Sequence, residues 1–469
     1  MQHIEQKRSV MAITLVASLG GFLFGFDMAV VSGVLPLLQK QFSLSAFQQG
    51  WFVSSALVGC IIGVALSGEL ADRVGRRKPM FIAAVLFLLS ALGCAFLPSL
   101  NGVIASRLMG GVGIGLASNI VPLYISEIAP AKSRGRLITY YQFALTLGIL
   151  VAYLSNAALL HVSLSSSNDH ATGFFSGFIT TEIWRLMLGL GAIPALVLLL
   201  GLFRVPESPR WLVQQGRTGE GQRILRSLQR DAETAVVQTP EPKGSYKELF
   251  SPRWRKALWI GLLLPLFSQF SGINAIIYYG PSILSDAGIS LSNSLLSQVI
   301  FGAANMLFTL IAIWKVDSLG RRPLYLWGTA GAAISLTLVG LYFNAGSSNS
   351  IGMLICVIIF LACFAFSIGP LKFVVAAEIF PNKIRGRAMA ISIMVMWIAD
   401  TIVGQLTPLL LGRFGTPVTF WIFAAFCVVA FITVHKLLPE TKGKTLEQIE
   451  DEWRQPSAGS GVAGALPEN

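Results

Sequence analysis

The sequence predicts an all-α polytopic membrane protein with twelve transmembrane helices arranged as two six-helix repeats. Three observations predict this fold: long uncharged stretches, a one-sided distribution of basic residues, and an internal sequence repeat. The chain has 469 residues, of which 54% are hydrophobic and 12% are charged, whereas about 25% of the residues in an ordinary soluble domain are charged. This composition excludes a disordered chain, a disulfide scaffold and an ordinary soluble enzyme.

Long stretches without Asp, Glu, Lys or Arg cover residues 79–106, 257–285, 287–314 and 323–371. One crossing of a bilayer core needs about 20 apolar residues, so the last stretch holds more than two crossings. We place the twelve spans near 11–35, 48–69, 79–98, 101–123, 137–160, 184–203, 257–284, 294–315, 323–344, 351–377, 388–411 and 417–437.

The basic residues gather on one side of this predicted topology. Thirty of the 35 Lys and Arg residues lie in the N-terminus, the C-terminal tail and one set of loops, whereas only Lys40 and Arg413 lie in the opposite loops. Cytoplasmic loops are enriched in Lys and Arg, so we expect both termini and the segment 204–256 in the cytoplasm. The net charge of +12 then requires no nucleic-acid partner.

An internal repeat divides the chain into two halves. The segment 72–77 (DRVGRR) recurs at 317–322 (DSLGRR), and the segment 127–136 (EIAPAKSRGR) recurs at 378–387 (EIFPNKIRGR). Such an offset spans an even number of helices and predicts parallel repeats around a central cavity. We therefore expect an N-terminal bundle at 1–204, a helical linker at 205–256, a C-terminal bundle at 257–438 and a tail at 439–469.

Two charges fall inside the predicted spans of the first half. Asp27 and Arg107 lie at depths of roughly 13 and 9 Å below the outer face, so the two side chains could meet. Ionisable residues within a membrane are costly, and they are candidates for function by default. The alternative is a static, purely structural ion pair.

Further motifs resemble those of a known family. The segments 21–27 (GFLFGFD), 206–212 (PESPRWL), 269–279 (QFSGINAIIYY) and 439–443 (PETKG), together with the repeated loops, resemble the sugar porters of the major facilitator superfamily. That family includes bacterial xylose–proton symporters and animal glucose facilitators. The resemblance extends from about residue 10 to 450 and implies transport by alternating access of the two bundles.

The resemblance also implies roles for single residues. Asp27 would carry the proton and Arg107 would pair with it, because the opposite charge favours the ionised aspartate until the arginine moves away. For each sugar-binding candidate, an interhelical hydrogen bond or plain packing is the alternative. The implied sugar-binding residues are Phe24, Gln142, Gln269, Asn274, Tyr278, Asn305, Phe373 and Trp397.

The repeated charged loops are candidates for a cytoplasmic gate. Gly75 and Gly320 permit tight turns, and the flanking arginines can pair with Glu127 and Glu378. We expect such pairs to hold the cytoplasmic ends of the two bundles together, although anchoring at lipid head groups is an alternative that can coexist with gating. The gate candidates are Asp72, Arg73, Arg76, Arg77, Glu127, Arg134, Asp317, Arg321, Arg322, Glu378 and Arg385.

The second half departs from the family pattern at several positions. Ser268 replaces the first of two glutamines, Phe373 replaces a tryptophan, and Met396 replaces an amide. Lys372 and Asp400 introduce unusual charges on consecutive spans, at roughly 9 and 18 Å from the inner face. Three interpretations stay open: a structural pair, a site that reads an acidic or modified sugar, and a lysine that snorkels to the cytoplasm.

We therefore predict a proton-coupled symporter of a monosaccharide or related polyol in the cell (inner) membrane, with a monomeric functional unit in contact with lipid. The alternatives are a proton-independent facilitator and a symporter of an acidic sugar read by Lys372. A non-transporting sugar sensor is disfavoured, because such a protein would be expected to carry a long cytoplasmic signalling extension, whereas the predicted tail at 439–469 is short. No enzyme motif, cofactor or metal is predicted, and the five cysteines are interpreted as buried thiols.

Overall fold

The computed structural model describes residues 2–130, 134–166, 182–228, 246–286, 288–345, 350–380, 382–440 and 442, with side chains throughout except at 2–9, 134–135, 166, 246, 312–319, 350, 373, 377 and 382–383. Within these ranges the chain is almost entirely helical and contains no strand. The predicted all-helical fold is therefore confirmed for the described part of the chain.

Six spans form the N-terminal half, and capping groups mark where several of them begin. A capping box of Ser45 and Gln48 opens the second span, and the hydroxyl of Ser99 accepts a hydrogen bond at the start of the fourth. The spans are α1 (Gln2–Phe42), α2 (Ala46–Val74), α3 (Arg77–Phe96), α4 (Leu100–Ile128), α5 (Arg134–Ser166), and the pair α7 (Ile183–Gly189) and α8 (Ala192–Leu202), which together make the sixth crossing.

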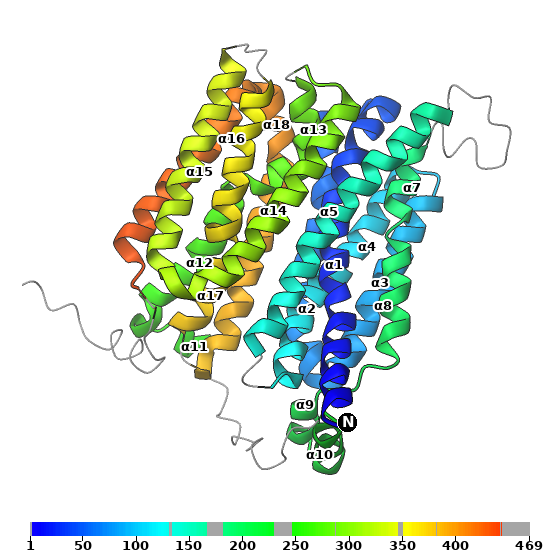
Figure 1. The fold of residues 1–469 in the computed structure, drawn as a ribbon, viewed down its shortest axis with the longest axis vertical. Coiled ribbons are helices and arrows are strands. Elements are labelled where there is room, and N and C mark those ends of the chain that lie inside the picture. The colour runs from blue at the N-terminus through cyan, green and yellow to red at the C-terminus, as the bar shows by residue number, and fades with distance from the viewer. Residues whose placement is uncertain are drawn as a thin grey trace, which may run out of the picture.

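Short helices connect the two halves. They are α9 (Pro209–Gln214), α10 (Thr218–Ser227), α11 (Tyr246–Leu249) and a 3₁₀ turn at Pro252–Trp254. Figure 1 shows α9 and α10 at the same end of the molecule as the N-terminus. We call this the linker end and the opposite end the far end. The rest of the predicted linker, 229–245, lies outside the described residues.

Six further spans form the C-terminal half, and two of them are interrupted. The seventh span breaks at Gly272, whose φ of 83° lies in the left-handed region, and the tenth contains a π-helical turn at Phe364–Ile368. The elements are α12 (Arg255–Phe270), α13 (Ile273–Asp286), α14 (Leu291–Leu319), α15 (Arg321–Asn344), α16 (Ser350–Cys363), α17 (Gly369–Ile379) and α18 (Asn382–Leu437).

The number of crossings agrees with the predicted topology. Eleven helices in the described residues are long and apolar enough to span a membrane. The last of them, α18, contains two helices joined at Gly415, where the backbone leaves the helical conformation at φ 78° and ψ 169°. These two halves are the predicted eleventh and twelfth spans. Between the predicted fifth and sixth spans, α5 extends to Ser166, six residues beyond the predicted end of the span at 160, and residues 167–181 lie outside the described residues.

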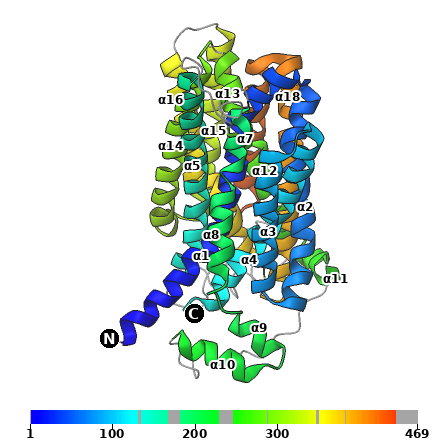
Figure 2. The ribbon, with the colours of Figure 1, turned by 90° about the vertical axis from the view of Figure 1, so that its right-hand side faces the viewer.

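Close backbone packing organises the N-terminal half. A Cβ atom at Gly111 on α4 would collide with the carbonyl oxygen of Ala56 on α2, so these two helices touch through their backbones. Helix α1 packs along α5 in the same half. The two halves stand side by side in Figures 1 and 2 and meet where α2 packs on α18, α5 on α14 and α1 on α13.

Candidate transport site

The two charges predicted in the first half lie close together. Arg107 Nη1 on α4 is 3.8 Å from Asp27 Oδ1 on α1. The guanidinium is also held by the second span, since its Nε donates to the carbonyl of Phe52 at 3.2 Å and its plane lies 5.0 Å from the Phe52 ring. Arg107 is thus fixed largely by contacts other than its aspartate, and the ion pair itself is long.

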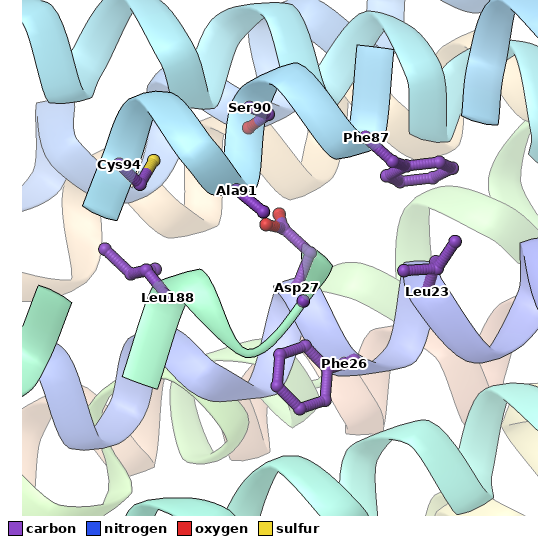
Figure 3. A pocket seen from close by; sticks show the side chains of 9 residues that line it. Leu23, Phe26, Asp27, Phe87, Ser90, Ala91, Cys94 and Leu188 are labelled. Atoms are coloured by element: carbon purple, nitrogen blue, oxygen red, sulfur yellow. The ribbon is translucent and has the colours of Figure 1, made fainter. Parts of the chain in front are cut away.

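A small pocket lies on another side of the same aspartate. Figure 3 shows the carboxylate of Asp27 pointing toward α3, near Ala91 and Ser90. Its Oδ2 atom is buried and has no hydrogen-bond partner among the described residues. The pocket is lined by Leu23, Phe26, Asp27, Phe87, Ser90, Ala91, Cys94, Leu188 and Gly191.

Two of the implied sugar-binding residues bind Asp400, and a third is joined to them through Asn274. Asn274 Nδ2 donates to Asp400 Oδ1 at 2.7 Å, and the Tyr278 hydroxyl lies 3.2 Å from both carboxylate oxygens. Asn274 Nδ2 also donates to Gln269 Oε1 at 2.9 Å. The break at Gly272 places Gln269 and Asn274 on the two sides of an interrupted helix, where a buried polar cluster forms on the seventh span.

Two implied aromatic residues meet between the halves. The rings of Phe24 on α1 and Trp397 on α18 have centroids 5.2 Å apart. Trp397 is fully buried, and its Nε1 has no hydrogen-bond partner among the described residues. This donor lies one helical turn before Asp400, so it faces the same part of the molecule. The side chain of Phe373 lies outside the described residues.

Two other implied residues are not part of this cluster. Gln142 on α5 and Asn305 on α14 are half-buried. Their backbone carbonyls accept hydrogen bonds from Thr146 and Thr309 one turn later in the same helices. No described hydrogen bond joins either side chain to Asp400.

The two unusual charges of the second half make different hydrogen bonds among the described residues. The Lys372 ammonium donates to the Ser268 hydroxyl at 2.9 Å, and Lys372 is only 7% exposed. Since Ser268 is fully buried in the middle of the seventh span, the head group of Lys372 lies inside the bundle. The snorkelling interpretation is therefore wrong for this structure. Asp400 instead accepts hydrogen bonds from the neutral donors Asn274 and Tyr278.

The charged loops at the linker end form ion pairs within each half. Arg76 makes three hydrogen bonds to Glu127 at 2.8–3.2 Å, and both side chains are buried. In the other half, Arg321 pairs with Glu378 at 2.9 Å. Each of the two described pairs therefore lies within one half and does not join the two bundles, because each arginine follows a span that packs beside its own partner helix.

The remaining gate candidates have local contacts. Arg73 pairs with Glu69 at 2.5 Å on an exposed surface, Asp72 lies 4.0 Å from Arg76, and Arg385 donates to the carbonyl of its neighbour Phe380. Arg77 donates to the carbonyls of Leu202 and Phe203, and Arg322 donates to the carbonyl of His435. The side chains of Arg134 and Asp317 lie outside the described residues.

Two glutamates that the sequence reasoning did not assign complete these loops. Glu207 accepts hydrogen bonds from the backbone N–H groups of Arg76 and Arg77, and Glu440 accepts from those of Arg321 and Arg322. Both glutamates follow the last span of a half in a Pro-Glu-Ser/Thr motif, and this recurrence was the available signal. Carboxylates at helix N-termini are stabilising, so each half carries the same clasp.

Comparison with known proteins identifies the family. A family model described as "Sugar (and other) transporter" matches residues 13–453. The chain belongs to the sugar transporter family. It is 39% identical to the arabinose–proton symporter of Bacillus subtilis (strain 168), with 95% of each chain covered. It is also 38% identical to the D-xylose–proton symporter of Escherichia coli (strain K12), over 95% of this chain and 96% of that protein.

A solved structure agrees with this assignment. An inward-open conformation of the xylose transporter from E. coli matches this sugar transporter with a TM-score of 0.79 at 36% identity, covering 95% of this chain and all of the other. The chain therefore has the major facilitator fold of twelve helices, as the sequence resemblance implied. It is a multi-pass membrane transporter, not an enzyme.

Hydrogen bonds join the two halves of the transporter in the part near the far end. Ser54 on α2 donates to Gln405 Oε1 on α18 at 2.7 Å, and Gln405 Nε2 donates to the Phe47 carbonyl at 3.2 Å. The Tyr153 hydroxyl reaches the carbonyl of Ile277 at 3.3 Å. The sequence reasoning missed Gln405, although an uncharged amide within a span was a visible signal.

Proposed function

We propose that this transporter is a proton-coupled symporter that imports a monosaccharide, a hexose or a pentose, or a closely related polyol. The observation that carries the proposal is the carboxylate of Asp27 inside the first span, 3.8 Å from Arg107. The names of the relatives support both parts of it, because they are proton symporters of arabinose and xylose. A facilitator without ion coupling would have no need for an ionisable group at this position.

The coupling would depend on the contacts of Arg107. The guanidinium is retained by the Phe52 carbonyl and ring, so it can stay in place when the long contact to Asp27 is lost. An opposite charge nearby favours the ionised aspartate. Asp27 would thus bind a proton in a conformation that separates it from Arg107, and it would release the proton when the pair forms again.

The driving force is sufficient for accumulation. One charge moving across 100 mV is worth about 2.3 kcal/mol. Each tenfold ratio of concentrations requires about 1.4 kcal/mol. The membrane potential alone would then sustain roughly 40-fold accumulation of the sugar, and a pH gradient would add to this value.

The sugar would bind between the two halves, near Trp397 and the Asp400 cluster. Its hydroxyl groups need partners in place of water, and Gln269, Asn274 and Tyr278 offer amide and hydroxyl groups there. The unpartnered Nε1 of Trp397 would donate to a sugar oxygen, and the ring of Phe24 would cover the apolar face of the sugar. Gln142 and Asn305 would reach the sugar from α5 and α14.

Alternating access would then move the bundles 1–204 and 257–438 about the bound sugar, with 205–256 as the connecting linker. The hydrogen bonds of Gln405 close the far end here, so opening of that end must break them. The basic loops favour placing the linker end in the cytoplasm of a cell membrane. The functional unit would be a single chain.

The proposal is tested by comparing Asp27→Asn with the wild type. Labelled pentoses, hexoses, polyols and uronates are offered to cells that lack their own transporters, with and without a protonophore. We expect the wild type to accumulate one of them and to make the medium alkaline on addition of that sugar to de-energised cells. Asp27→Asn should lose both effects but retain exchange of labelled for unlabelled sugar. Protonophore-resistant transport without alkalinisation would identify a facilitator.

A further inference from the structure

The pocket beside Asp27 belongs entirely to the N-terminal half. Its lining side chains come from α1, α3, α7 and the turn before α8, and none comes from the C-terminal half. Figure 3 shows Asp27 between Leu23 and Phe26 on one side and the helix that carries Ser90 and Cys94 on the other. This pocket is therefore separate from the space between the two halves, where the sugar would bind.

The two oxygens of the Asp27 carboxylate have different surroundings. Oδ1 faces Arg107 at 3.8 Å, whereas Oδ2 is buried without a partner among the described residues. A buried carboxylate oxygen without a hydrogen bond is costly. The pocket offers polar neighbours in the hydroxyl of Ser90 and the thiol of Cys94. The other six lining residues are apolar, and the Cys94 thiol also donates to the carbonyl of Val103 at 3.8 Å. Asp27 Oδ2 and the Ser90 hydroxyl are then the main partners for one buried water molecule.

On α1, the face that lines the pocket differs from the face that contacts the C-terminal half. Phe24 contacts Trp397, and Met28 Sδ contacts the Tyr278 hydroxyl at 3.4 Å, so these two residues face the C-terminal half. Leu23, Phe26 and Asp27 line the pocket instead. At 3.6 residues per turn the two faces lie roughly 120° apart around the helix. A sugar on the first face does not occupy the second.

The pocket lies in the part of the N-terminal half that is nearer the far end. Cys94 lies two residues before the end of α3, and Leu188 and Gly191 lie in the first part of the sixth crossing, which starts at the far end. Polar groups continue beyond them, because Arg185 binds Glu182 at 2.9 Å and also the carbonyl of Leu97. A hydrated route from this end would therefore reach Asp27 without crossing the sugar path.

We propose that this pocket is the proton-access site of the transporter, and that protons reach Asp27 through it rather than through the central sugar path. A hydronium ion in the pocket transfers its proton to Oδ2, where an O–H bond forms as one O–H bond of the hydronium breaks and water is left. This transfer takes place while Asp27 and Arg107 are apart, and the neutral carboxyl is then no longer attracted back to the arginine. The inference rests on the proposed symport and adds the route of the coupled ion.

Two substitutions fill the pocket from opposite walls. Ala91→Leu adds bulk from α3. Gly191→Val adds it from the sixth crossing, where the backbone is right-handed helical and a Cβ atom would stand 3.6 Å from Phe26 and 3.7 Å from Ala91. Val85→Leu is the matched control, since it adds one methylene on an exposed part of α3.

The variants are reconstituted into liposomes that contain a pH-sensitive dye, with the sugar that the wild type transports in the panel above. We expect sugar-dependent proton movement to fall about tenfold in both filling variants, because a filled pocket cannot hold the transferring water. Exchange of labelled sugar should stay at the wild-type level, and Val85→Leu should behave as the wild type. Wild-type proton movement in both filling variants would overturn the inference.

A second measurement does not depend on folding of a variant. In a protein that keeps Cys94 as its single cysteine, methyl methanethiosulfonate adds a small group inside the pocket after folding. We expect sugar-dependent proton movement to be lost while sugar exchange continues, and Cys94→Ala to be insensitive. A thiol that does not react, or a reaction that stops exchange and proton movement equally, would contradict a separate hydrated route.

Asp27→Asn is measured beside these proteins. If the wild type moves no proton with the sugar, the proposed symport itself is wrong, and if this variant still couples proton movement to sugar, the proton is not carried by Asp27. If it does not, and the filled pocket has no effect, only the route is wrong.

Discussion

Asn274 Nδ2 lies 2.7 Å from Asp400 Oδ1, so an amide of the broken seventh span is bound directly to a carboxylate of α18. The Tyr278 hydroxyl donates to the same carboxylate at 3.2 Å. The carboxylate therefore organises side chains that the sequence assigned to the sugar. Asp400 accepts these hydrogen bonds from neutral donors, and those donors depend on an acceptor at position 400.

Replacement of Asp400 should depend on whether an acceptor remains. Asp400→Asn keeps one oxygen for Asn274 or Tyr278, whereas Asp400→Leu leaves both donors buried without a partner. An unsatisfied buried donor costs about 1–3 kcal/mol, so Asp400→Leu should unfold at a clearly lower temperature than Asp400→Asn. Thermal unfolding in detergent checks this order. Equal melting temperatures would show that these hydrogen bonds do not stabilise the fold.

A double substitution distinguishes a structural role of Lys372 from a role in binding the substrate. If Lys372 and Asp400 balance each other's charge, Lys372→Met and Asp400→Asn should each reduce uptake and the double variant should recover it, because a lone buried charge is costly. If Lys372 reads an acidic sugar, the double variant should transport but with a changed preference. Uptake of neutral sugars and uronates by all four proteins distinguishes the two cases.

Trp397 should donate its indole N–H to the substrate. Trp397→Phe keeps a ring beside Phe24 and removes only the donor. Loss of one hydrogen bond costs about 0.5–1.5 kcal/mol, so the half-saturating sugar concentration should rise about two- to tenfold. Sugar exchange at varied concentration measures this change. An unaltered value would remove the indole N–H from the sugar site.

The ion pairs Arg76–Glu127 and Arg321–Glu378 should differ in how much they stabilise the fold. Arg76 and Glu127 have side chains 6% and 8% exposed, against 13% and 24% for Arg321 and Glu378. Removing one member of a buried pair costs about 3–5 kcal/mol, and greater exposure lowers this cost. Arg76→Ala should therefore lower the melting temperature more than Arg321→Ala. The reverse order of melting temperatures would contradict the inference that the more buried pair, in the N-terminal half, stabilises the fold more.

Gln405 should hold the far end closed. Gln405→Ala removes hydrogen bonds to both Ser54 and the Phe47 carbonyl. A loss of about 1 kcal/mol shifts a two-state equilibrium about fivefold. Distances between spin labels at positions 96 and 414, both exposed near the far end, should then report more of the open state.

The matched control for this latch is Gln41→Ala. Gln41 binds Trp184 and Glu182, which belong to the same half. Its removal breaks far-end hydrogen bonds without freeing one half from the other, so the distribution of label distances should stay as in the wild type. A similar shift in both variants would mean that Gln405 has no special part in closure.

The amino-acid sequence was sufficient to predict the fold class, the number of crossings and the proximity of Asp27 to Arg107. Apolar stretches of bilayer length form helices, because a helix satisfies the hydrogen bonds of its own backbone N–H and C=O groups where no water is present. The repeat of charged loops fixed the two halves. The rise per residue of a helix gave the depths of Asp27 and Arg107 in the membrane, and these similar depths predicted that the two side chains could meet.

The three-dimensional structure was needed to show which side chains meet around Asp400, which half each arginine–glutamate pair belongs to, and that a pocket lies beside Asp27. Rise per residue gives depth but not rotation of one helix about its axis or the side from which a neighbour approaches. Lys372 illustrates this: its depth made Asp400 a candidate partner, and only the packing of α17 on α12 shows that its ammonium donates to Ser268. Contacts between spans depend on such packing, which no single span encodes.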